Sequence, residues 1–287
     1  MKILVLGAGG QVGRAVVRAT PAAHATIGKT RTELDIADAP AIAALLDCRG
    51  FDWIVNAAAY TAVDLAEDEK AQARLVNDTA VGVLTQAAAR AGCRLVHLST
   101  DFVFDGASSR AYAPADSPNP LSVYGETKLG GERRVLQGGS GVVLRTAWVY
   151  ASAGRNFVLT MLKLMRERDE LRVVCDQIGA PTWAGGLGAT IWSLIEADAP
   201  PGLYHWTDLG VATWYDFAVA IQEEALARGL LARAVPIRPI RSSEYPTRAR
   251  RPAFSVLDTA STRALVGVPG RHWRQHLRMM LDELRGA

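Results

Sequence analysis

The sequence predicts an α/β protein built on a doubly wound parallel sheet of the Rossmann type, with a smaller C-terminal lobe. Short apolar runs of strand length alternate with helical patterns through the first half of the chain. Small and polar residues follow where several of these runs end, which is the edge where such sheets bind ligands. After about residue 151 the alternation fades into mixed helix, short strands and proline-punctuated loops, as in a second, smaller unit.

Composition places the chain among globular proteins. Its 287 residues are 49% hydrophobic and 21% charged, enough for one large domain and a small second one. The net charge of +3 is small and the arginines are spread along the chain, so we predict no nucleic-acid binding. No apolar run approaches the length of a membrane span, and the first one is broken at Gly7, so neither membrane insertion nor a signal peptide is predicted.

The cysteines argue against an oxidising compartment. Cys48, Cys93 and Cys175 are odd in number, far apart and free of any Cys-x-x-Cys pair. This pattern supports neither a disulfide framework nor a thiolate zinc site. We therefore expect a cytoplasmic protein.

The first predicted strand, residues 3–6, leads directly into a glycine-rich turn. Gly7, Gly10 and Gly13 are spaced three apart, and an Ala- and Val-rich helix follows. Such glycines allow a tight turn, close approach to a pyrophosphate and close helix–strand packing, and the helix N–H groups bind the phosphates. A plain tight turn is the alternative, but the strand before and the helix after favour a dinucleotide site, so we assign residues 1–150 to a dinucleotide-binding domain.

The second predicted strand, residues 25–28, ends without the acidic residue that would bind a ribose 2′-hydroxyl. It is followed instead by Lys29, Thr30 and Arg31. Because the extra phosphate of NADPH needs a cation, Arg31 favours NADPH, with NADH left possible. A solvated basic turn is the alternative.

Two further segments approach the same predicted edge. Asp35 and Ile36 fit the adenine end of a dinucleotide, although Asp35 could instead cap a helix that begins near Pro40. The strand in residues 52–59 ends in small residues, which leave room for a ligand or for close helix packing. Helical patterns then run from about residue 66 to residue 91.

The candidate catalytic residues come after the next predicted strand. The apolar run from Arg94 ends in Ser99, Thr100 and Asp101 at the same sheet edge. Further on, Tyr124 and Lys128 are four residues apart, so they lie one turn apart on one helix face. An ammonium beside a phenol favours the ionised phenol, which makes Tyr124 a usable proton donor or acceptor. The alternative is a packed tyrosine and a solvated lysine.

A basic segment lies far along the C-terminal half. Residues 245–252 concentrate Arg248, Arg250 and Arg251 between two prolines. The segment could bind a diphosphate or be an exposed loop, and the sequence leaves open whether these arginines contact a ligand. We expect residues 151–287 to form mainly a substrate-binding lobe, with segments that return to the first domain.

Taken together, these motifs resemble the extended short-chain dehydrogenases/reductases, and more narrowly the dTDP-4-dehydrorhamnose reductase family. The resemblance spans nearly the whole chain. The dehydrogenase motifs alone fix only the superfamily, whereas the later ones are more specific. The matching segments are residues 7–13, 34–36, 56–64, 99–106, 120–128, 145–150, 176–182, 202–206, 213–218 and 245–247.

The resemblance implies reduction of the C4 ketone of dTDP-4-dehydro-L-rhamnose to dTDP-L-rhamnose, a step that feeds cell-surface polysaccharide. By this resemblance, Tyr124 would donate a proton to the substrate, and Thr100 would hydrogen-bond the substrate oxygen. Lys128 would lower the pKa of Tyr124 and bind the nicotinamide ribose. Asp101 and Trp148 would contact the sugar nucleotide. The cofactor would be bound by Gly7, Gly10, Gln11, Val12, Gly13, Arg31, Asp35, Ile36, Ala59, Tyr60, Thr61, Tyr124 and Lys128.

Departures from the family pattern limit these expectations. Phe102 replaces a frequent tyrosine, so a related dTDP-4-keto-deoxysugar is an alternative substrate. Family members that dimerise around magnesium carry glutamates where this chain has Ala15 and Gly185, so we predict no metal; a homodimer of another kind stays possible. The chain also resembles the regulatory β subunit of methionine adenosyltransferase, which binds a nicotinamide nucleotide without turning over sugar.

Overall fold

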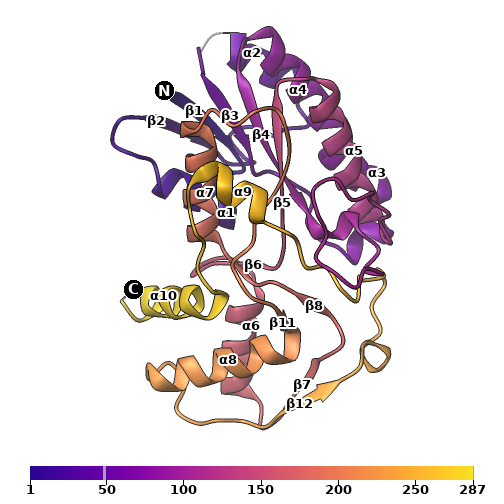
Figure 1. The fold of residues 1–287 in the computed structure, drawn as a ribbon, viewed down its shortest axis with the longest axis vertical. Coiled ribbons are helices and arrows are strands. Elements are labelled where there is room, and N and C mark those ends of the chain that lie inside the picture. The colour runs from indigo at the N-terminus through magenta and orange to yellow at the C-terminus, as the bar shows by residue number, and fades with distance from the viewer. Residues whose placement is uncertain (48–49, 287) are drawn as a thin grey trace.

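Six parallel strands form the central sheet of the computed structural model, which describes residues 1–47 and 50–286 (Figure 1). Cys48 lies outside these residues. The spatial order of the strands is β10-β5-β4-β3-β1-β2. This arrangement confirms the predicted doubly wound parallel sheet. The strands are β1 (Lys2–Leu6), β2 (Ala25–Lys29), β3 (Trp53–Asn56), β4 (Arg94–Thr100), β5 (Gly141–Thr146) and β10 (Gly202–His205).

Helices cover both faces of this sheet (Figure 1). Side chains alternate along a strand, so β1 buries Ile3 and Val5 against one helical layer and Leu4 and Leu6 against the other. Burial on both faces explains why the strands are continuous apolar runs. The first layer contains α1 (Gln11–Arg18), α7 (Ala184–Glu196) and α9 (Ala260–Val266), and the second contains α2 (Ala39–Asp47), α4 (Ala80–Arg90) and α5 (Val123–Gln137).

The order of the strands reverses between β1 and β3. From β1 the chain moves outward to β2, then returns to place β3 on the other side of β1. Crevices at the carboxyl ends of strands at such a reversal are where these folds bind ligands. Gly7 follows β1, and Ala57 follows β3, so the predicted cofactor segments converge there.

The helical stretch expected over residues 66–91 is interrupted. It consists of η1 (Leu65–Glu67), α3 (Lys70–Arg74), a π-helical turn η2 (Leu75–Thr79) and α4. The wider turn of a π-helix shifts the side chains that follow it, and such turns are frequent at functional sites. Here it buries Asn77, whose amide binds the backbone of Tyr60 through both its donor and its acceptor.

The C-terminal half contributes to two parts of the molecule (Figure 1). β10 extends the central sheet beside β5, and α7 packs on α1. A separate core lies among α6 (Phe157–Glu167), α8 (Trp214–Ala227) and α10 (Trp273–Arg285). Among the described residues, none of the helices has the length and apolarity that spanning a bilayer needs. The remaining elements are η3 (Asp101–Val103), η4 (Ser242–Glu244) and the strand pairs β6 (Val149–Tyr150) with β9 (Thr182–Trp183), β7 (Leu171–Val174) with β12 (Ile237–Ile240), and β8 (Ile178–Gly179) with β11 (Ala212–Thr213).

A buried ion pair joins α5 to the sheet. Arg145 on β5 makes two hydrogen bonds to the Glu132 carboxylate, of 2.8 Å from Nε and 2.6 Å from Nη2. Both side chains are 1% exposed. Ser99 donates to the same carboxylate over 2.5 Å, and the His205 ring lies 3.3 Å from Arg145 Nη1. The pair therefore fixes how α5 lies against β4 and β5.

Breaking this pair should destabilise the fold strongly. Arg145→Met leaves the Glu132 carboxylate buried without its cation, which costs about 3–5 kcal/mol in comparable pairs. Urea unfolding measures the loss. As a matched control, Arg172→Met removes an exposed partner of Glu244 and should cost less than about 1 kcal/mol. Equal losses for the two variants would show that the buried pair has no special role.

Candidate functional site

Two adjoining cavities follow the carboxyl edge of the sheet. The larger has a volume of about 830 Å³ and the smaller about 240 Å³. Gly9, Gly10, Ala57 and Ala59 line both, so the two form one trough across the end of β1 and β3. Its size and elongated shape suit an extended ligand beside a smaller one.

The glycine turn forms the floor where the cavities meet. Gly7 has φ +75°, and a Cβ there would lie 2.6 Å from the Ala58 nitrogen. A Cβ on Gly13 would overlap the Gly7 carbonyl, so Gly13 shapes the turn from beneath. Gly10, Gln11 and Val12 line the larger cavity, and no described side chain caps the start of α1. The N–H groups of this first turn are thus available to an anion.

The predicted adenine segment lines the smaller cavity. Arg31, Asp35, Ile36 and Tyr60 all contribute to its wall. Arg31 Nε lies 3.4 Å from Asp35 Oδ2, and the Arg31 side chain is 76% exposed, which leaves it free to reorient. Asp35 does not cap the helix near Pro40. Its carboxylate accepts from the Ala37 nitrogen, and Asp38 accepts from Ala41 at the start of α2 instead.

The three residues of the predicted reaction line the larger cavity together. Thr100 ends β4, while Tyr124 and Lys128 lie one turn apart on α5. The helix begins here because Ser122 accepts a hydrogen bond from the Gly125 nitrogen over 3.2 Å. Ala59 and Thr61 line the same cavity. The structure therefore brings the cofactor turn and these three side chains to one space.

The protonation of Tyr124 differs from the expectation. Burial raises the pKa of Tyr124 to about 12, and the hydrogen bond with Thr100 offsets only part of this shift. Lys128 does not lower it: the Lys128 Nζ donates to the Leu98 carbonyl over 2.6 Å. Burial also lowers the pKa of Lys128 to about 8, against the attraction of Glu132. Desolvation outweighs the helical proximity of the two groups.

Asp101 is buried at the cavity wall. Its Oδ1 accepts from the Thr100 hydroxyl over 3.0 Å, and a side-chain hydrogen bond with Ser255 also favours the charged carboxylate. Burial raises the pKa of Asp101 to about 6 from its ordinary 3.8.

Trp148 presents its indole to the cavity in a fixed orientation. Its backbone has φ 47°, and its ring stacks on Trp214 with centroids 3.6 Å apart. Trp214 begins α8, where Thr213 and Asp216 form a capping box. Trp214 also lines the larger cavity. Sequence reasoning did not assign it a role, although the capping pattern of residues 213–216 marks the helix start that positions it.

The basic segment divides between the ligand space and the surface. Arg251 lines the larger cavity, and its Nη2 lies 2.6 Å from Asp64 Oδ2. Arg248 pairs with Asp68, and Arg250 is exposed. The loop is therefore attached to the first domain through two ion pairs, with one arginine directed at the trough.

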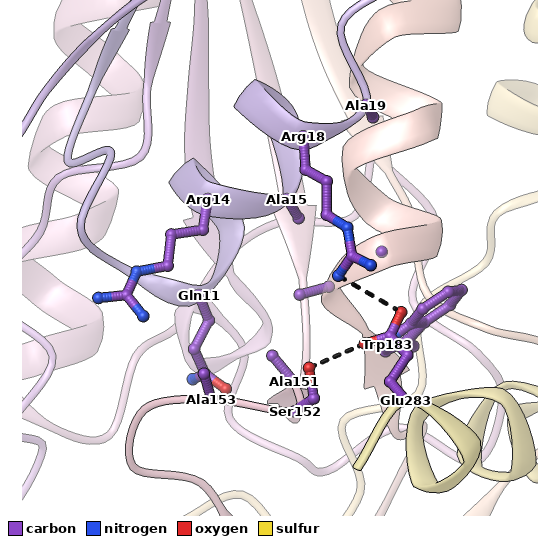
Figure 2. Close-up of a pocket in the computed structure, with 12 residues that line it drawn as sticks. Gln11, Arg14, Ala15, Arg18, Ala19, Ala151, Ser152, Ala153, Trp183 and Glu283 are labelled. Carbon is purple, nitrogen blue, oxygen red and sulfur yellow. Dashed lines mark hydrogen bonds and ion pairs between the residues drawn. The ribbon is translucent and has the colours of Figure 1, made fainter. Parts of the chain in front are cut away.

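A further cavity of about 400 Å³ adjoins the trough at Gln11, Arg14 and Ala153 and lies between α1, α7 and α10 (Figure 2). Ala15 and Gly185 both line it. Glu283 is the carboxylate among its lining residues, and it lies 3.7 Å from Arg18 and accepts from Ser152 over 2.8 Å. In the described part of the chain, no group of three His, Cys, Asp or Glu side chains is arranged to bind a metal.

Comparison with known proteins identifies the family. The model of the RmlD substrate binding domain matches residues 1–286. The chain belongs to this family. The dTDP-4-dehydrorhamnose reductase of Burkholderia thailandensis is 42% identical, over 99% of both chains. The resemblance inferred from the sequence is thereby confirmed.

Solved structures of family members have the same fold. The dTDP-4-dehydrorhamnose reductase of Clostridium acetobutylicum superposes with a TM-score of 0.94 at 35% identity, covering 99% of this chain and 100% of that one. The reductase of Bacillus anthracis, solved in complex with NADP, superposes with a TM-score of 0.93 at 30% identity, covering 98% and 99%. The family fold therefore extends over the full length of this chain.

Asp101→Asn should stabilise the protein at high pH. The folded-state pKa of Asp101 is raised, so the unfolded chain loses this proton first and stability falls as pH rises from 3.8 to about 6. We expect a gain of about 1–3 kcal/mol at pH 8 and almost none at pH 4, measured by urea unfolding at both values. A gain that does not depend on pH would contradict the assigned cause.

Proposed function

We propose that this chain catalyses the NADPH-dependent reduction of the C4 ketone of dTDP-4-dehydro-L-rhamnose to dTDP-L-rhamnose, in nucleotide-sugar and cell-surface polysaccharide biosynthesis. One observation carries the proposal: Thr100, Tyr124 and Lys128 line the same cavity as the glycine turn. The family and its named reductases agree with this chemistry. The chain is accordingly an oxidoreductase of the short-chain dehydrogenase/reductase type.

The trough fits a nicotinamide dinucleotide. The turn at Gly7 and Gly13 leaves no space for a Cβ, so only glycine allows the chain to turn this tightly at the edge of the trough. When bound, the cofactor supplies a hydride to C4. The N–H groups of Gln11 and Val12 would hold its phosphates, with Gly10, whose N–H donates to the Gly7 carbonyl over 2.9 Å, lining the space beside them. The remaining contacts would come from Arg31, Asp35 and Ile36 at the adenosine end, from Ala59, Tyr60 and Thr61 in the middle, and from Lys128 at the nicotinamide ribose.

Tyr124 would give its proton to the ketone oxygen as C4 is reduced. Because the pKa of Tyr124 is raised to about 12, the phenol is protonated at neutral pH and is a donor suited to a basic alkoxide. Thr100, beside Tyr124, would hold the same oxygen. The two hydroxyls together would stabilise the charge that develops there.

The sugar nucleotide would lie between Asp101 and the stacked indoles. Trp148 offers a flat apolar face to the sugar ring, and Trp214 behind it prevents the indole from turning away. Asp101 lines the same cavity and would contact a sugar hydroxyl. Arg251 lines the cavity and would hold the diphosphate in place of Asp64, its present partner.

A related dTDP-4-keto-deoxysugar is the second candidate substrate. Phe102 lines the cavity and contacts Tyr124 edge-on, with ring centroids 5.6 Å apart. A tyrosine at this position would add a hydroxyl near the reacting carbon. Its absence removes one polar contact and so relaxes discrimination among sugars.

We also propose that the protein works in the cytoplasm and forms a homodimer. The free thiols of Cys93 and Cys175 suit a reducing compartment. Ala15 and Gly185, which line the cavity beside Glu283, offer no carboxylate to a metal, so such a dimer would not depend on a metal there.

Tyr124→Phe tests the chemistry. The phenyl ring keeps its packing but has no proton to give, so kcat for NADPH oxidation with dTDP-4-dehydro-L-rhamnose should fall about 10²–10⁴-fold. The Kd for NADPH should change little. Tyr204→Phe is the matched control, because that hydroxyl binds the Pro200 carbonyl at the surface. Turnover by Tyr124→Phe at the wild-type rate would refute the assignment.

Arg31→Ala tests the cofactor preference. Loss of a hydrogen-bonded cation from the 2′-phosphate should lower the ratio of kcat/KM for NADPH to that for NADH about 10- to 100-fold. Lys29→Ala, which removes the cation at the end of β2 two residues before Arg31, serves as the comparison and should leave the ratio unchanged. The assignment fails if the ratio responds to Lys29 instead of Arg31.

A further inference from the structure

His97 lies in the middle of β4, directly behind the proposed reaction site. Sequence reasoning treats it as a packed strand histidine. In the structure it is fully buried, and its ring joins two polar side chains: Asn56 at the end of β3 and Lys128 on α5. Because this buried ring lies beside a proposed catalytic residue, it matters which of its two nitrogens carries a proton.

The orientation of Asn56 is fixed by the backbone. The Ala58 nitrogen donates to Asn56 Oδ1 over 3.2 Å, so the other end of the amide, Nδ2, faces His97 Nδ1 at 3.1 Å. Nδ2 is only a donor. His97 Nδ1 must therefore accept this hydrogen bond and carry no proton.

The proton of His97 is thus on the opposite nitrogen. Burial and the nearby Lys128 hold the pKa of His97 well below its ordinary value, so the ring is neutral and carries one N–H. With Nδ1 an acceptor, that N–H is at Nε2, which lies 3.5 Å from Lys128 Nζ. A charged ammonium has three donors and no acceptor, whereas a neutral amine can accept from Nε2–H.

We propose that the Asn56–His97 pair is a positioning device for Lys128: it presents an N–H donor to Nζ, favours the uncharged amine, and so sets the protonation of this lysine. The inference deepens the proposed function, on which the role of Lys128 rests. His97 and Asn56 act through Lys128 and are assigned no contact with the substrate. Burial alone lowers the pKa of Lys128 to about 8, so the His97 N–H acts on a lysine that gains and loses its proton near neutral pH.

A second buried histidine has the opposite arrangement. His205 Nδ1 faces the Tyr112 carbonyl at 3.0 Å, so that nitrogen carries the proton and Nε2 accepts from Arg145. Beside the permanent cation Arg145, the His205 ring therefore presents an acceptor nitrogen. Beside Lys128, the His97 ring presents an N–H donor. The difference comes from the partner of Nδ1, a carbonyl for His205 and an amide NH₂ for His97.

The other charged groups near Lys128 do not favour its uncharged form. On α5 the groups are Tyr124, whose pKa burial raises to about 12, and Glu132, which pairs with Arg145 of β5 and still favours the charged form of Lys128. Asp101 follows β4 and is bonded to Thr100. Asp78 of η2 pairs with Arg134. Glu132 attracts a proton to Lys128, so the His97 N–H acts against it.

NMR of the wild-type protein labelled with ¹⁵N-histidine tests the tautomer without any substrate. Protonated and bare ring nitrogens resonate apart, and the His97 signals are assigned from their loss in His97→Gln. We expect Nε2 to carry the proton. A proton on Nδ1 would overturn the proposal, whatever the reaction of the enzyme.

Asn56→Asp tests the consequence for Lys128. A carboxylate would accept from both Ala58 N and His97 Nδ1–H, which moves the ring proton to Nδ1 and turns Nε2 into an acceptor for the ammonium. With ¹³C-labelled lysine, the Lys128 titration should move upward by about one pH unit from its wild-type midpoint near 8. The other lysines, Lys2, Lys29, Lys70 and Lys163, are internal references.

The double variant Asn56→Asp/His97→Leu separates the tautomer from the new charge. If the effect passes through the ring, the upward shift caused by Asn56→Asp disappears in the His97→Leu background. A shift of the same size there would show direct attraction by the new carboxylate and refute the proposal. If Asn56→Asp only disturbs Ala58, NADPH binding weakens and the Lys128 titration stays in place, which also refutes it.

The pH dependence of kcat/KM links this device to turnover. With an active ketone substrate, the alkaline limb should move upward in Asn56→Asp by the same amount as the Lys128 titration. An inactive wild type would count against the proposed function alone, because both NMR measurements are made without turnover. A limb that stays in place while Lys128 shifts would show that the protonation of Lys128 does not govern the reaction.

Discussion

The buried pair of Glu132 and Arg145 is the constraint on which the proposed reaction site depends. Tyr124, Lys128 and Glu132 are spaced four residues apart, so they form one stripe along α5. Glu132 is bonded to both β4 and β5, which prevents the helix from sliding or rotating on the sheet. The positions of the amine and the phenol at the strand ends therefore follow from an ion pair that lies about one helical turn from Lys128 and two from Tyr124.

Much of this arrangement could be predicted because it is encoded locally. Continuous apolar runs identified the buried strands, and the glycine spacing identified the turn after β1. Parallel strands bring their carboxyl ends to one edge, so Thr100 and Asp101 had to face the same space as that turn. Periodicity placed Tyr124 and Lys128 on one helix face. Each of these inferences needs only neighbours in the chain and one rule of topology.

The remainder depends on contacts between distant segments. The direction of Lys128 toward the Leu98 carbonyl follows from packing of α5 on β4, and proximity along the helix does not reveal it. Trp214 meets Trp148 across the boundary between the two parts of the molecule. Asn77 contacts Tyr60 from a π-helical turn that buries its side chain. The pattern of apolar residues does not predict such a turn. The burial of Tyr124, which raises its pKa, is likewise a property of the assembled cavity.

The return of β10 to the central sheet has a consequence for how the chain is made. β5 is buried along its whole length, yet the strand that covers its outer edge is not synthesised until residues 202–205. A nascent chain that ends near residue 150 already contains the glycine turn and the reaction helix, but it carries an apolar strand with an open edge. Open edges are templates for wrong pairing. The first 150 residues are therefore not a separable module, because the central sheet is completed only by a strand from the second half of the chain.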